Sequence, residues 1–283
     1  MPYISNTERW ALITGASTGI GAETARHLAR AGYSLGLLAR SRDRLEEMSR
    51  ELSATGIRTL VLPADVADTS QLRGAVETMM AEAGRIDLVV SNAGIETYCP
   101  LHELDIEQIH QTINVNLTAA IVLCRLVLPH MRAAGSGHIV AISSTAGKFG
   151  PAYGAAYGAS KAGLLSLVRT LRAEYHGEGI SASCVCPGFT SEGGMYERMK
   201  ADLGHGTPKA MGSTTAKEVA RQVLRCAERD VPEVIVNRPP VRPAIVLAEM
   251  FPRLGEWLIR RTSRKFLKQV ARSSSRKHLR RAA

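Results

Sequence analysis

A tyrosine and a lysine occur four residues apart in the segment Tyr157-Gly-Ala-Ser-Lys161. If this segment is helical, the two side chains lie on one face, because residues four apart are neighbours on a helix surface. A free tyrosine titrates near pKa ~10, too high for efficient proton transfer at neutral pH, and a nearby positive charge stabilises the phenolate. The pair therefore predicts an acid–base group, although the same spacing is common on exposed helices that have no function.

A glycine-rich segment, Thr14-Gly-Ala-Ser-Thr-Gly-Ile-Gly21, follows the first apolar run and precedes a helical pattern. Glycines allow a sharp turn and a close approach of the backbone to a diphosphate, and the helix N-terminus supplies free N–H groups. The spacing is GxxxGxG, not the GxGxxG of the general dinucleotide fingerprint, and such turns also occur merely for tight packing. Its position after a first strand favours cofactor binding. The expected contacts are Gly15, Ser17, Thr18, Gly19, Ile20 and Gly21.

The end of the second apolar run predicts which dinucleotide binds. Ala39-Arg40-Ser41-Arg42 occupies the place where an NAD-binding protein usually has an acid for the ribose 2′-OH, and Arg40 follows Gly21 by 19 residues. Arginine favours a 2′-phosphate, and no carboxylate is present to repel it. We therefore expect NADP(H). The alternative is that Arg40 and Arg42 are simply solvated residues at the start of a helix.

These segments need a scaffold, and the chain alternates short apolar runs with amphipathic helical patterns. This alternation is typical of a parallel sheet covered on both faces. We expect one α/β domain over residues 1–237, a doubly wound, Rossmann-type parallel sheet of about seven strands with helices on both faces. The expected strands are 10–14, 34–39, 58–62, 88–91, 138–142, 181–186 and 234–236. The expected helices are near 20–31, 42–54, 69–83, 103–133, 156–176 and 215–228.

The composition excludes several other classes of protein. With 283 residues, 45% of them hydrophobic, the chain is long enough for a sizeable core. Five scattered cysteines without CxxC spacing argue against disulfides and zinc ribbons, and the eight histidines lack metal-ligand spacing, so we expect no metal. No stretch looks long enough to span a membrane, and the N-terminus lacks a signal-peptide core. We expect a cytoplasmic protein in a reducing compartment.

Further motifs accompany the tyrosine in a fixed order. Asn92-Ala-Gly94 follows the fourth strand, Asn114-Val-Asn-Leu117 lies in the next helix, Ser143-Ser144 ends the fifth strand, and Pro187-Gly188 follows the sixth. Together with the glycine turn and YxxxK, this set resembles the short-chain dehydrogenase/reductase family over about residues 8–237. The resemblance implies an oxidoreductase that moves a hydride between a nicotinamide cofactor and a substrate, interconverting a carbonyl and a secondary alcohol.

The resemblance also implies a role for each catalytic residue. Tyr157 would protonate the carbonyl oxygen during reduction, or act as the base in the reverse direction. Lys161 would lower the pKa of Tyr157 and hydrogen-bond the nicotinamide ribose. Ser144 would orient and polarise the substrate carbonyl, whereas Ser143 more simply caps the strand. Asn116, in preference to Asn114, would hold a water that links Lys161 to solvent.

For the cofactor, the resemblance implies that Asp65 accepts a hydrogen bond from the adenine amino group. Glu192 departs from the family, which often has a threonine there to hold the carboxamide; backbone groups of Thr190, or Ser191, would substitute. The remaining implied contacts are Val66, Asn92, Ala93, Gly94, Pro187, Gly188 and Thr190, together with Tyr157 and Lys161.

Two regions break the alternating pattern. Residues 188–214 hold six glycines and three methionines, which indicates either an adaptable lid over an apolar substrate or a loop packed on the body. Residues 238–283 form a C-terminal extension. Residues 253–283 contain eleven Lys or Arg and one acid, so this end alone accounts for the net charge of +10.

Within the extension, the apolar stretch 245–259 is expected to pack on the body or on a neighbouring subunit. Residues 260–281 show an apolar and a basic face at helical spacing, which favours contact with an anionic membrane surface. Nucleic-acid binding is not expected, because the basic face lacks aromatic residues and the body is neutral.

These observations predict an NADP(H)-dependent oxidoreductase acting on a lipophilic small molecule, with ketone or aldehyde reduction as the favoured direction. We expect a cytoplasmic homodimer or homotetramer built through the helices near 103–133 and 156–176, with peripheral membrane association through the tail. The alternative is a dinucleotide-binding scaffold or redox sensor without turnover. The presence of all four expected catalytic residues argues against that alternative.

Overall fold

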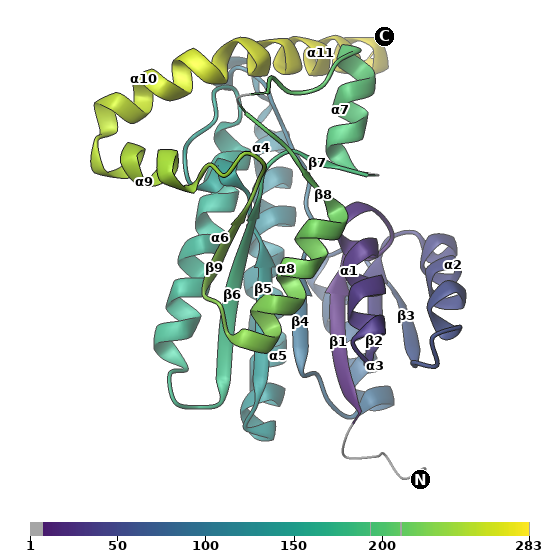
Figure 1. The fold of residues 1–283 in the computed structure, drawn as a ribbon. Coiled ribbons are helices and arrows are strands. Elements are labelled where there is room, and N and C mark those ends of the chain that lie inside the picture. The colour runs from purple at the N-terminus through teal and green to yellow at the C-terminus, as the bar shows by residue number, and fades with distance from the viewer. Residues whose placement is uncertain (1–7, 193, 210, 283) are drawn as a thin grey trace.

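The computed structural model describes residues 8–192, 194–209 and 211–282, with side chains as far as Ser273. Seven parallel strands form one sheet in the order β3-β2-β1-β4-β5-β6-β9 (Figure 1). They are β1 (Arg9–Thr14), β2 (Tyr33–Ala39), β3 (Thr59–Pro63), β4 (Leu88–Ser91), β5 (Gly137–Ile142), β6 (Ile180–Pro187) and β9 (Glu233–Val236). The predicted Rossmann-type sheet is confirmed, and each predicted strand lies within two residues of the observed one.

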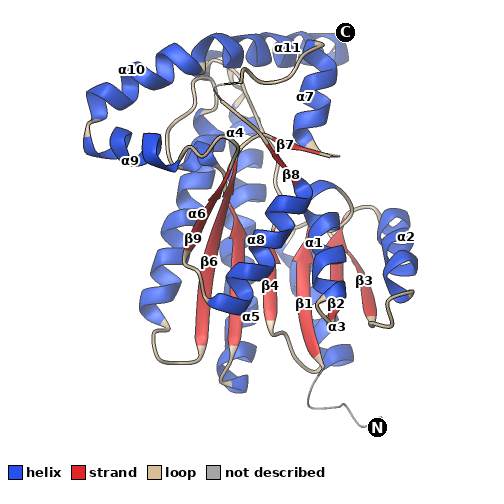
Figure 2. Cartoon of the chain, viewed as in Figure 1, coloured by secondary structure: helices blue, strands red, loops and turns tan. Residues whose placement is uncertain are grey.

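Helices cover both faces of this sheet (Figure 2). They are α1 (Gly19–Arg30), α2 (Arg42–Ser53), α3 (Thr69–Ala83), α4 (Ile106–Ile113), α5 (Ala119–Ala134), α6 (Ala155–Glu174) and α8 (Ala216–Arg229). Successive strand residues face opposite sides. In β1, Trp10 and Leu12 pack in the core under α3, α5 and α6, whereas Ala11 and Ile13 pack in the core under α1, α2 and α8. All four are fully buried, which explains why the strands read as continuous apolar runs.

The strand order reverses between β1 and β4. From β1 the chain moves outward through β2 and β3, then returns to β4 and continues through β5, β6 and β9. The loops that leave the carboxyl ends of β1 and β4 therefore diverge and leave a crevice at that edge of the sheet. The glycine turn follows β1 and Asn92 follows β4, so both motifs lie at this switch point.

The predicted helix over 103–133 is interrupted by a π-helical turn. This turn, η2 (Asn114–Thr118), joins α4 to α5, and Asn116 is buried within it. The continuous segment Ile106–Ala134 has a mean hydropathy of 1.6 and is long enough to cross a membrane. The prediction that no stretch has that length and composition was therefore wrong. Leu123 and Val127 of this segment pack in the sheet core, which accounts for its apolar composition.

Residues 188–214 contain more structure than their sequence indicated. A two-stranded ribbon, β7 (Thr190–Ser191) with β8 (Thr214–Thr215), flanks the helix α7 (Met195–Leu203). Tyr196 and Met199 of α7 are buried, so this region packs on the body of the protein.

The C-terminal extension forms three helices: α9 (Arg242–Met250), α10 (Pro252–Thr262) and α11 (Arg264–Ala282). Figure 1 shows α9 and α10 as a hairpin that projects beside the sheet, and α11 crossing above its carboxyl edge to reach α7.

The burial of the extension is the reverse of the prediction. The apolar residues of α11, including Phe266, Leu267 and Val270, are buried against the body rather than available to a membrane. In α9 and α10 the buried residues are Ile245 and Gly255, and the larger apolar side chains are exposed. The prediction that residues 245–259 pack on the body of the same chain is therefore wrong. Their packing on a neighbouring subunit stays a prediction. Side chains 274–281 of the predicted membrane segment lie outside the described residues.

Candidate active site

A cavity of about 540 Å³ opens at the carboxyl edge of the sheet, at the switch point between β1 and β4. Nearly all residues predicted from the sequence line it. The predicted residues in the lining are Gly15, Ser17, Thr18, Gly19, Ile20, Arg40, Asp65, Val66, Asn92, Ala93, Gly94, Ser144, Tyr157, Lys161, Pro187, Gly188 and Thr190. Gly21 and Asn116 are not in the lining, and both lie buried directly behind it.

The glycine turn has the backbone geometry that its sequence predicted. Gly15 and Gly19 adopt positive φ angles of 65° and 56°, a region that favours glycine. A Cβ added at Gly21 would overlap the carbonyl oxygen of Gly15, so only glycine permits the first turn of α1 to pack on the loop. Thr18, the N-cap residue of α1, makes no side-chain capping hydrogen bond. The Thr18 side chain therefore does not occupy the N–H groups at this helix N-terminus, and free N–H groups of this kind commonly bind phosphate.

Thr14 and Asn92 join the ends of β1 and β4. The Thr14 hydroxyl accepts hydrogen bonds from the backbone N–H groups of Asn92 (2.9 Å) and Ala93 (3.0 Å). In return, the Asn92 side-chain amide donates to the Thr14 carbonyl at 2.9 Å. The Asn92–Gly94 segment therefore braces β4 against β1 through hydrogen bonds across the crevice.

Helix α6 places the tyrosine and the lysine at the inner end of the cavity, and both are buried. The Lys161 Nζ lies 5.9 Å from the centroid of the Tyr157 ring and donates a hydrogen bond to the Ile142 carbonyl at 2.9 Å. The Ser144 hydroxyl donates a hydrogen bond to the Pro187 carbonyl at 3.4 Å and accepts one from the Ala146 N–H at 3.1 Å. Ser143 instead donates to the Lys161 carbonyl at 2.7 Å, and so ties β5 to α6. That contact fits the structural role expected for Ser143.

The electrostatics of the pair differ from the sequence-based expectation. Burial raises the pKa of Tyr157 well above its usual value, the carboxyl of Glu96 raises it further, and the hydrogen bond from Ser144 opposes both effects. Burial also lowers the pKa of Lys161 to about 8. The chain's own groups alone do not bring the pKa of Tyr157 towards neutrality, and the expectation that Lys161 does so together with a nicotinamide ring stays a prediction. The chain's own groups keep Tyr157 protonated, which suits a general acid.

Asn116 lies behind the lysine. Its side-chain amide accepts a hydrogen bond from the Ile95 N–H (2.8 Å) and donates to the Ile95 carbonyl (2.9 Å) and the Ser160 hydroxyl (3.0 Å). A Cβ on Gly94 would lie 3.1 Å from the Asn116 oxygen and 3.3 Å from the Lys161 Nζ. Gly94 therefore keeps these two polar groups close together. The water-holding role of Asn116 stays a prediction.

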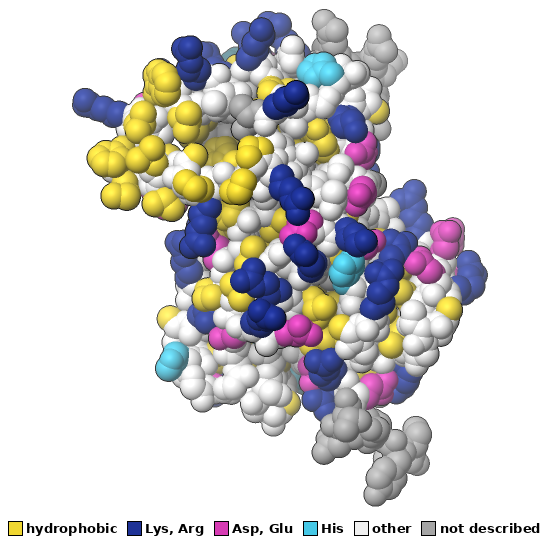
Figure 3. Space-filling view, viewed as in Figure 1, with side chains coloured by type: hydrophobic (Ala, Val, Ile, Leu, Met, Phe, Trp, Pro, Cys, Tyr) yellow, Lys and Arg dark blue, Asp and Glu magenta, His cyan; other side chains and the backbone are white. Residues whose placement is uncertain are grey.

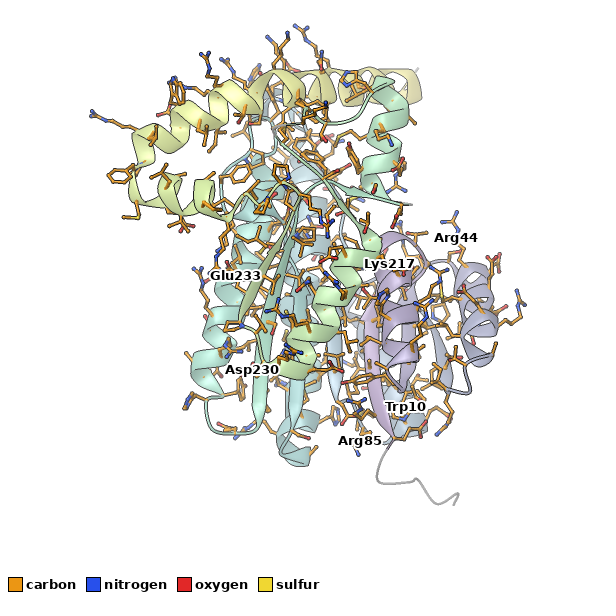
Figure 4. The ribbon with its side chains drawn as sticks, viewed as in Figure 1. Trp10, Arg44, Arg85, Lys217, Asp230 and Glu233 are labelled. Carbon is orange, nitrogen blue, oxygen red and sulfur yellow. The ribbon has the colours of Figure 1, made fainter. Side chains whose placement is uncertain are left out.

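The outer end of the cavity is basic. Arg40 and Arg44 line it, and Figure 4 shows Arg44 at the end of α2 nearest this edge. Arg42, by contrast, points to Glu46 at 3.6 Å on the surface of the helix. Arg42 therefore fits the alternative of a solvated residue, whereas Arg40 is exposed and also lines the cavity, so its contact with a 2′-phosphate stays a prediction. Sequence reasoning missed Arg44, which lies four residues beyond Arg40.

The Asp65 carboxylate, which also lines the cavity, accepts a hydrogen bond from the Ala67 N–H at 2.9 Å.

The segment after β6 is held by its own hydrogen bonds. The Thr190 hydroxyl donates to the Gly188 carbonyl (3.1 Å), and the Ser191 hydroxyl donates to the Thr214 carbonyl (3.1 Å). Glu192 is exposed and has a positive φ of 76°. Since the Ser191 hydroxyl is already bonded to the backbone of β8, backbone groups of Thr190 are the better substitute for the threonine that the family often has in place of Glu192.

Aromatic and aliphatic side chains cover the inner end of the cavity. The centroids of Tyr98 and Tyr157 are 6.0 Å apart, and Phe189 packs edge-on against Phe266 of α11 at 5.7 Å. Leu267, also from α11, lines the cavity. The additional lining residues on this side are Phe149, Pro151, Met195, Tyr196, Met211 and Ser263. The lid predicted from 188–214 thus contributes to the wall, but α11 completes it.

One carboxyl lies among these apolar groups. Glu96 lines the cavity, and burial raises its pKa to about 7, an effect that Arg198 partly offsets. Arg198 lines the same cavity from α7. Sequence reasoning missed Glu96 and Tyr98, although a charged residue two positions after the Asn92–Gly94 motif was a signal that could have been used.

Comparison with known proteins agrees with this geometry. Residues 9–203 match the short chain dehydrogenase family. The ketoacyl reductase HetN of Nostoc sp. is 38% identical over 239 residues, covering 84% of this chain and 82% of that protein. A Drosophila melanogaster dehydrogenase/reductase SDR family protein 7-like is 32% identical over 258 residues, covering 88% and 78%.

Solved structures are similar as well. A metagenomic short-chain oxidoreductase in complex with NADP superimposes with a TM-score of 0.69 at 32% identity, covering 81% of this chain and 96% of that chain. An alcohol dehydrogenase from the archaeon Thermococcus sibiricus, complexed with 5-hydroxy-NADP, gives a TM-score of 0.71 at 30% identity, covering 82% and 97%.

Proposed function

This chain belongs to the short-chain dehydrogenase family, and we propose that it is an NADP(H)-dependent enzyme that reduces the carbonyl group of a lipophilic ketone or aldehyde. The observation behind the proposal is that one cavity joins an acid–base group to a diphosphate cradle. Tyr157, Lys161 and Ser144 lie at its inner end, and the glycine turn lies at its outer end.

The chain's residues fit the cofactor. The Gly15–Gly21 turn and the start of α1 would hold the diphosphate, because their geometry leaves backbone N–H groups facing the cavity. Asp65 would face the adenine, and Lys161 the nicotinamide ribose. When bound, NADPH would supply the hydride.

The protein's own contribution is to align the substrate and to control one proton. Ser144 would hydrogen-bond the carbonyl oxygen, and the Tyr157 hydroxyl would deliver its proton to that oxygen as negative charge develops there. The ammonium of Lys161 would stabilise the phenolate left behind. Reduction as the working direction is proposed from the NADPH expected as the cofactor, and the protonated state of Tyr157 is compatible with it.

Preference for the 2′-phosphate is proposed from Arg40 and Arg44. Both line the outer end of the cavity, and the end of β2 offers no carboxylate to repel a phosphate. Fluorescence titration with NADPH and with NADH tests this. Wild-type protein should bind NADPH more tightly, and Arg40→Ala should weaken NADPH with little effect on NADH. Tighter binding of NADH by the wild type would refute the assignment.

The lipophilic substrate is proposed from the apolar and aromatic wall beside Tyr157. A panel of ketones and aldehydes, followed by the loss of NADPH absorbance, is the direct test of function. Longer or bulkier apolar carbonyl compounds should give the higher kcat/KM. Tyr157→Phe should abolish turnover and retain NADPH binding; wild-type rates in this variant would refute the acid–base role. Cofactor binding without turnover on any carbonyl would favour the scaffold or sensor instead.

We also propose a cytoplasmic homodimer or homotetramer. Ile106 of α4 and Ile121 of α5 are exposed at 68% and 46%, and their burial between subunits would remove apolar surface from water. The cysteines are all free, in keeping with a reducing compartment. Light scattering after gel filtration measures the assembly, and a monomeric mass would refute it.

A further inference from the structure

Exposed apolar side chains concentrate on the α9–α10 hairpin. Six of the nine large apolar side chains that are exposed among the described residues lie within a twelve-residue stretch. They are Val246, Leu247, Met250, Phe251, Leu254 and Trp257, with exposed fractions from 42% to 66%. Figure 3 shows them as one patch over the hairpin, and we refer to these six residues as the hairpin patch.

The hairpin is closed on itself and leaves the patch uncovered. Gly255 of α10 packs so tightly on Ala248 of α9 that an added Cβ would lie 2.7 Å from the Ala248 Cβ. The contact between the two helices thus buries small residues and turns the large apolar side chains outward. A contiguous exposed patch of this size on a folded protein indicates a surface that binds something.

Positive charge borders the hairpin patch. Arg261 lies 5.7 Å from the Trp257 ring, and the exposed side of α11 carries Lys265, Lys268 and Arg272. None of these four cations has an ion-pair partner among the described residues. Figure 3 shows basic side chains along the outer edge of α10 and α11, beside the apolar patch. Apolar and aromatic side chains flanked by free cations are the composition of a surface that inserts at the boundary of an anionic bilayer.

We propose that the α9–α10 hairpin docks this enzyme on an anionic lipid bilayer, with the hairpin patch in the headgroup–acyl boundary and the basic side of α11 against the headgroups. A second copy of the chain fits the charge less well, because a two-fold interface would bring two equally basic surfaces together. A bilayer supplies the opposite charge and requires no matching shape.

The docking surface lies next to the substrate cavity. Ser263 directly follows α10, and with Leu267 of α11 it lines the cavity. The bilayer-facing helices and the wall of the cavity are therefore parts of one continuous segment. A lipophilic carbonyl compound dissolved in the bilayer would reach the cavity from this side.

Vesicle binding of the full chain tests the proposal. Sedimentation with phosphatidylcholine vesicles containing phosphatidylserine should pellet the protein, whereas phosphatidylcholine alone, or high salt, should pellet much less. A Phe251→Ser, Trp257→Ser double variant should lose about tenfold or more in partitioning. Leu101→Ser removes an apolar side chain that is 61% exposed and lies outside the hairpin patch, and it should bind vesicles like the wild type.

Tryptophan emission gives a second readout. The chain has two tryptophans; Trp10 is fully buried, whereas Trp257 is 49% exposed and lies at the other end of the molecule from Trp10 (Figures 1 and 4). Binding to anionic vesicles should shift the emission to shorter wavelength through Trp257 alone, and brominated acyl chains should quench it.

Three results would overturn the proposal: no pelleting with anionic vesicles, equal pelleting of the double variant, or a double variant that changes from dimer to monomer in sedimentation velocity. The last would show that a second copy covers the patch. Turnover of a water-soluble carbonyl without vesicles should be unchanged in the double variant, so failure of docking is distinguishable from failure of the proposed reaction.

Discussion

Replacing the buried lysine with methionine should make the protein more stable and inactive. Lys161 is 3% exposed, and its pKa falls from 10.5 to about 8 because burial penalises the charged amine. A fall of this size corresponds to about 3 kcal/mol of lost native-state stability at neutral pH. Methionine has a similar length and avoids that cost, but it leaves the Ile142 carbonyl without its 2.9 Å hydrogen bond, a loss of about 1–2 kcal/mol.

The net expectation for Lys161→Met at pH 7 is a gain of about 1–2 kcal/mol, or a rise of several degrees in Tm. The gain should depend on pH. Between about pH 8 and 10.5 the unfolded wild-type chain keeps its lysine proton while the folded chain loses it, so wild-type stability rises with pH through this window. The difference between variant and wild type should therefore shrink above pH 8.

Urea unfolding of both proteins at pH 7 and at pH 10 measures this difference, with turnover assayed in parallel. Lys148→Met is the matched control, because the Lys148 side chain is 7% exposed and pairs with Glu233 at 2.7 Å. Its loss removes the shorter of the two ion pairs of Glu233 and leaves that carboxylate with Arg169 at 3.4 Å, so the variant should destabilise the protein. If Lys161→Met loses stability as the control does, or if its advantage is the same at both pH values, the electrostatic reasoning fails.

Three further variants test the cavity. Gly21→Ala should abolish NADPH binding by forcing α1 away from the glycine turn. The control Gly74→Ala, which has open space around its Cβ, should bind NADPH normally. Equal NADPH affinity of the two variants in a fluorescence titration would contradict diphosphate binding by the glycine turn. Glu96→Gln removes a negative charge that raises the pKa of Tyr157, so the pH–rate profile for alcohol oxidation should move to lower pH, and an unchanged or alkaline-shifted profile would argue against coupling. Leu267→Ala shortens a side chain of the cavity wall and should raise KM for small apolar carbonyl compounds about tenfold, with less effect on kcat. A change in kcat without a change in KM would mean that α11 does not contact the substrate.

The central fold could be predicted because each strand satisfies two demands at once. A strand buried on both faces must be apolar throughout, and a parallel neighbour requires a helix between the two strands. Both demands are visible in a single sequence, so the strand positions were close to those observed. The helix α7 was missed because it is short and begins after a glycine pair, which left too few residues to show a period.

Within the site, prediction succeeded for residues that lie inside a motif and failed for residues that reach the cavity from elsewhere. The spacing of Tyr157 and Lys161 can be interpreted from helix geometry, and Ser144 was predicted from the resemblance to the family. Glu96 has no such spacing, and the raised pKa of its carboxyl comes from burial among side chains of several elements. Leu267 enters the cavity from a helix more than one hundred residues after Tyr157, and no local pattern could place it there.

The extension shows what an amphipathic pattern does and does not determine. The pattern indicates that one face of a helix is buried away from water. It does not distinguish burial in a bilayer from burial against a protein surface. The prediction therefore relied on the density of apolar residues, and it expected the denser stretch, residues 245–259, to pack on the body of the protein. In the structure the sparser helix, α11, covers an aromatic cluster around Tyr98 and Tyr157, and only a few bulky side chains, such as Phe266, are needed to close it. The denser hairpin is left outside, so this one extension both completes the wall of the cavity and carries six of the nine exposed large apolar side chains among the described residues.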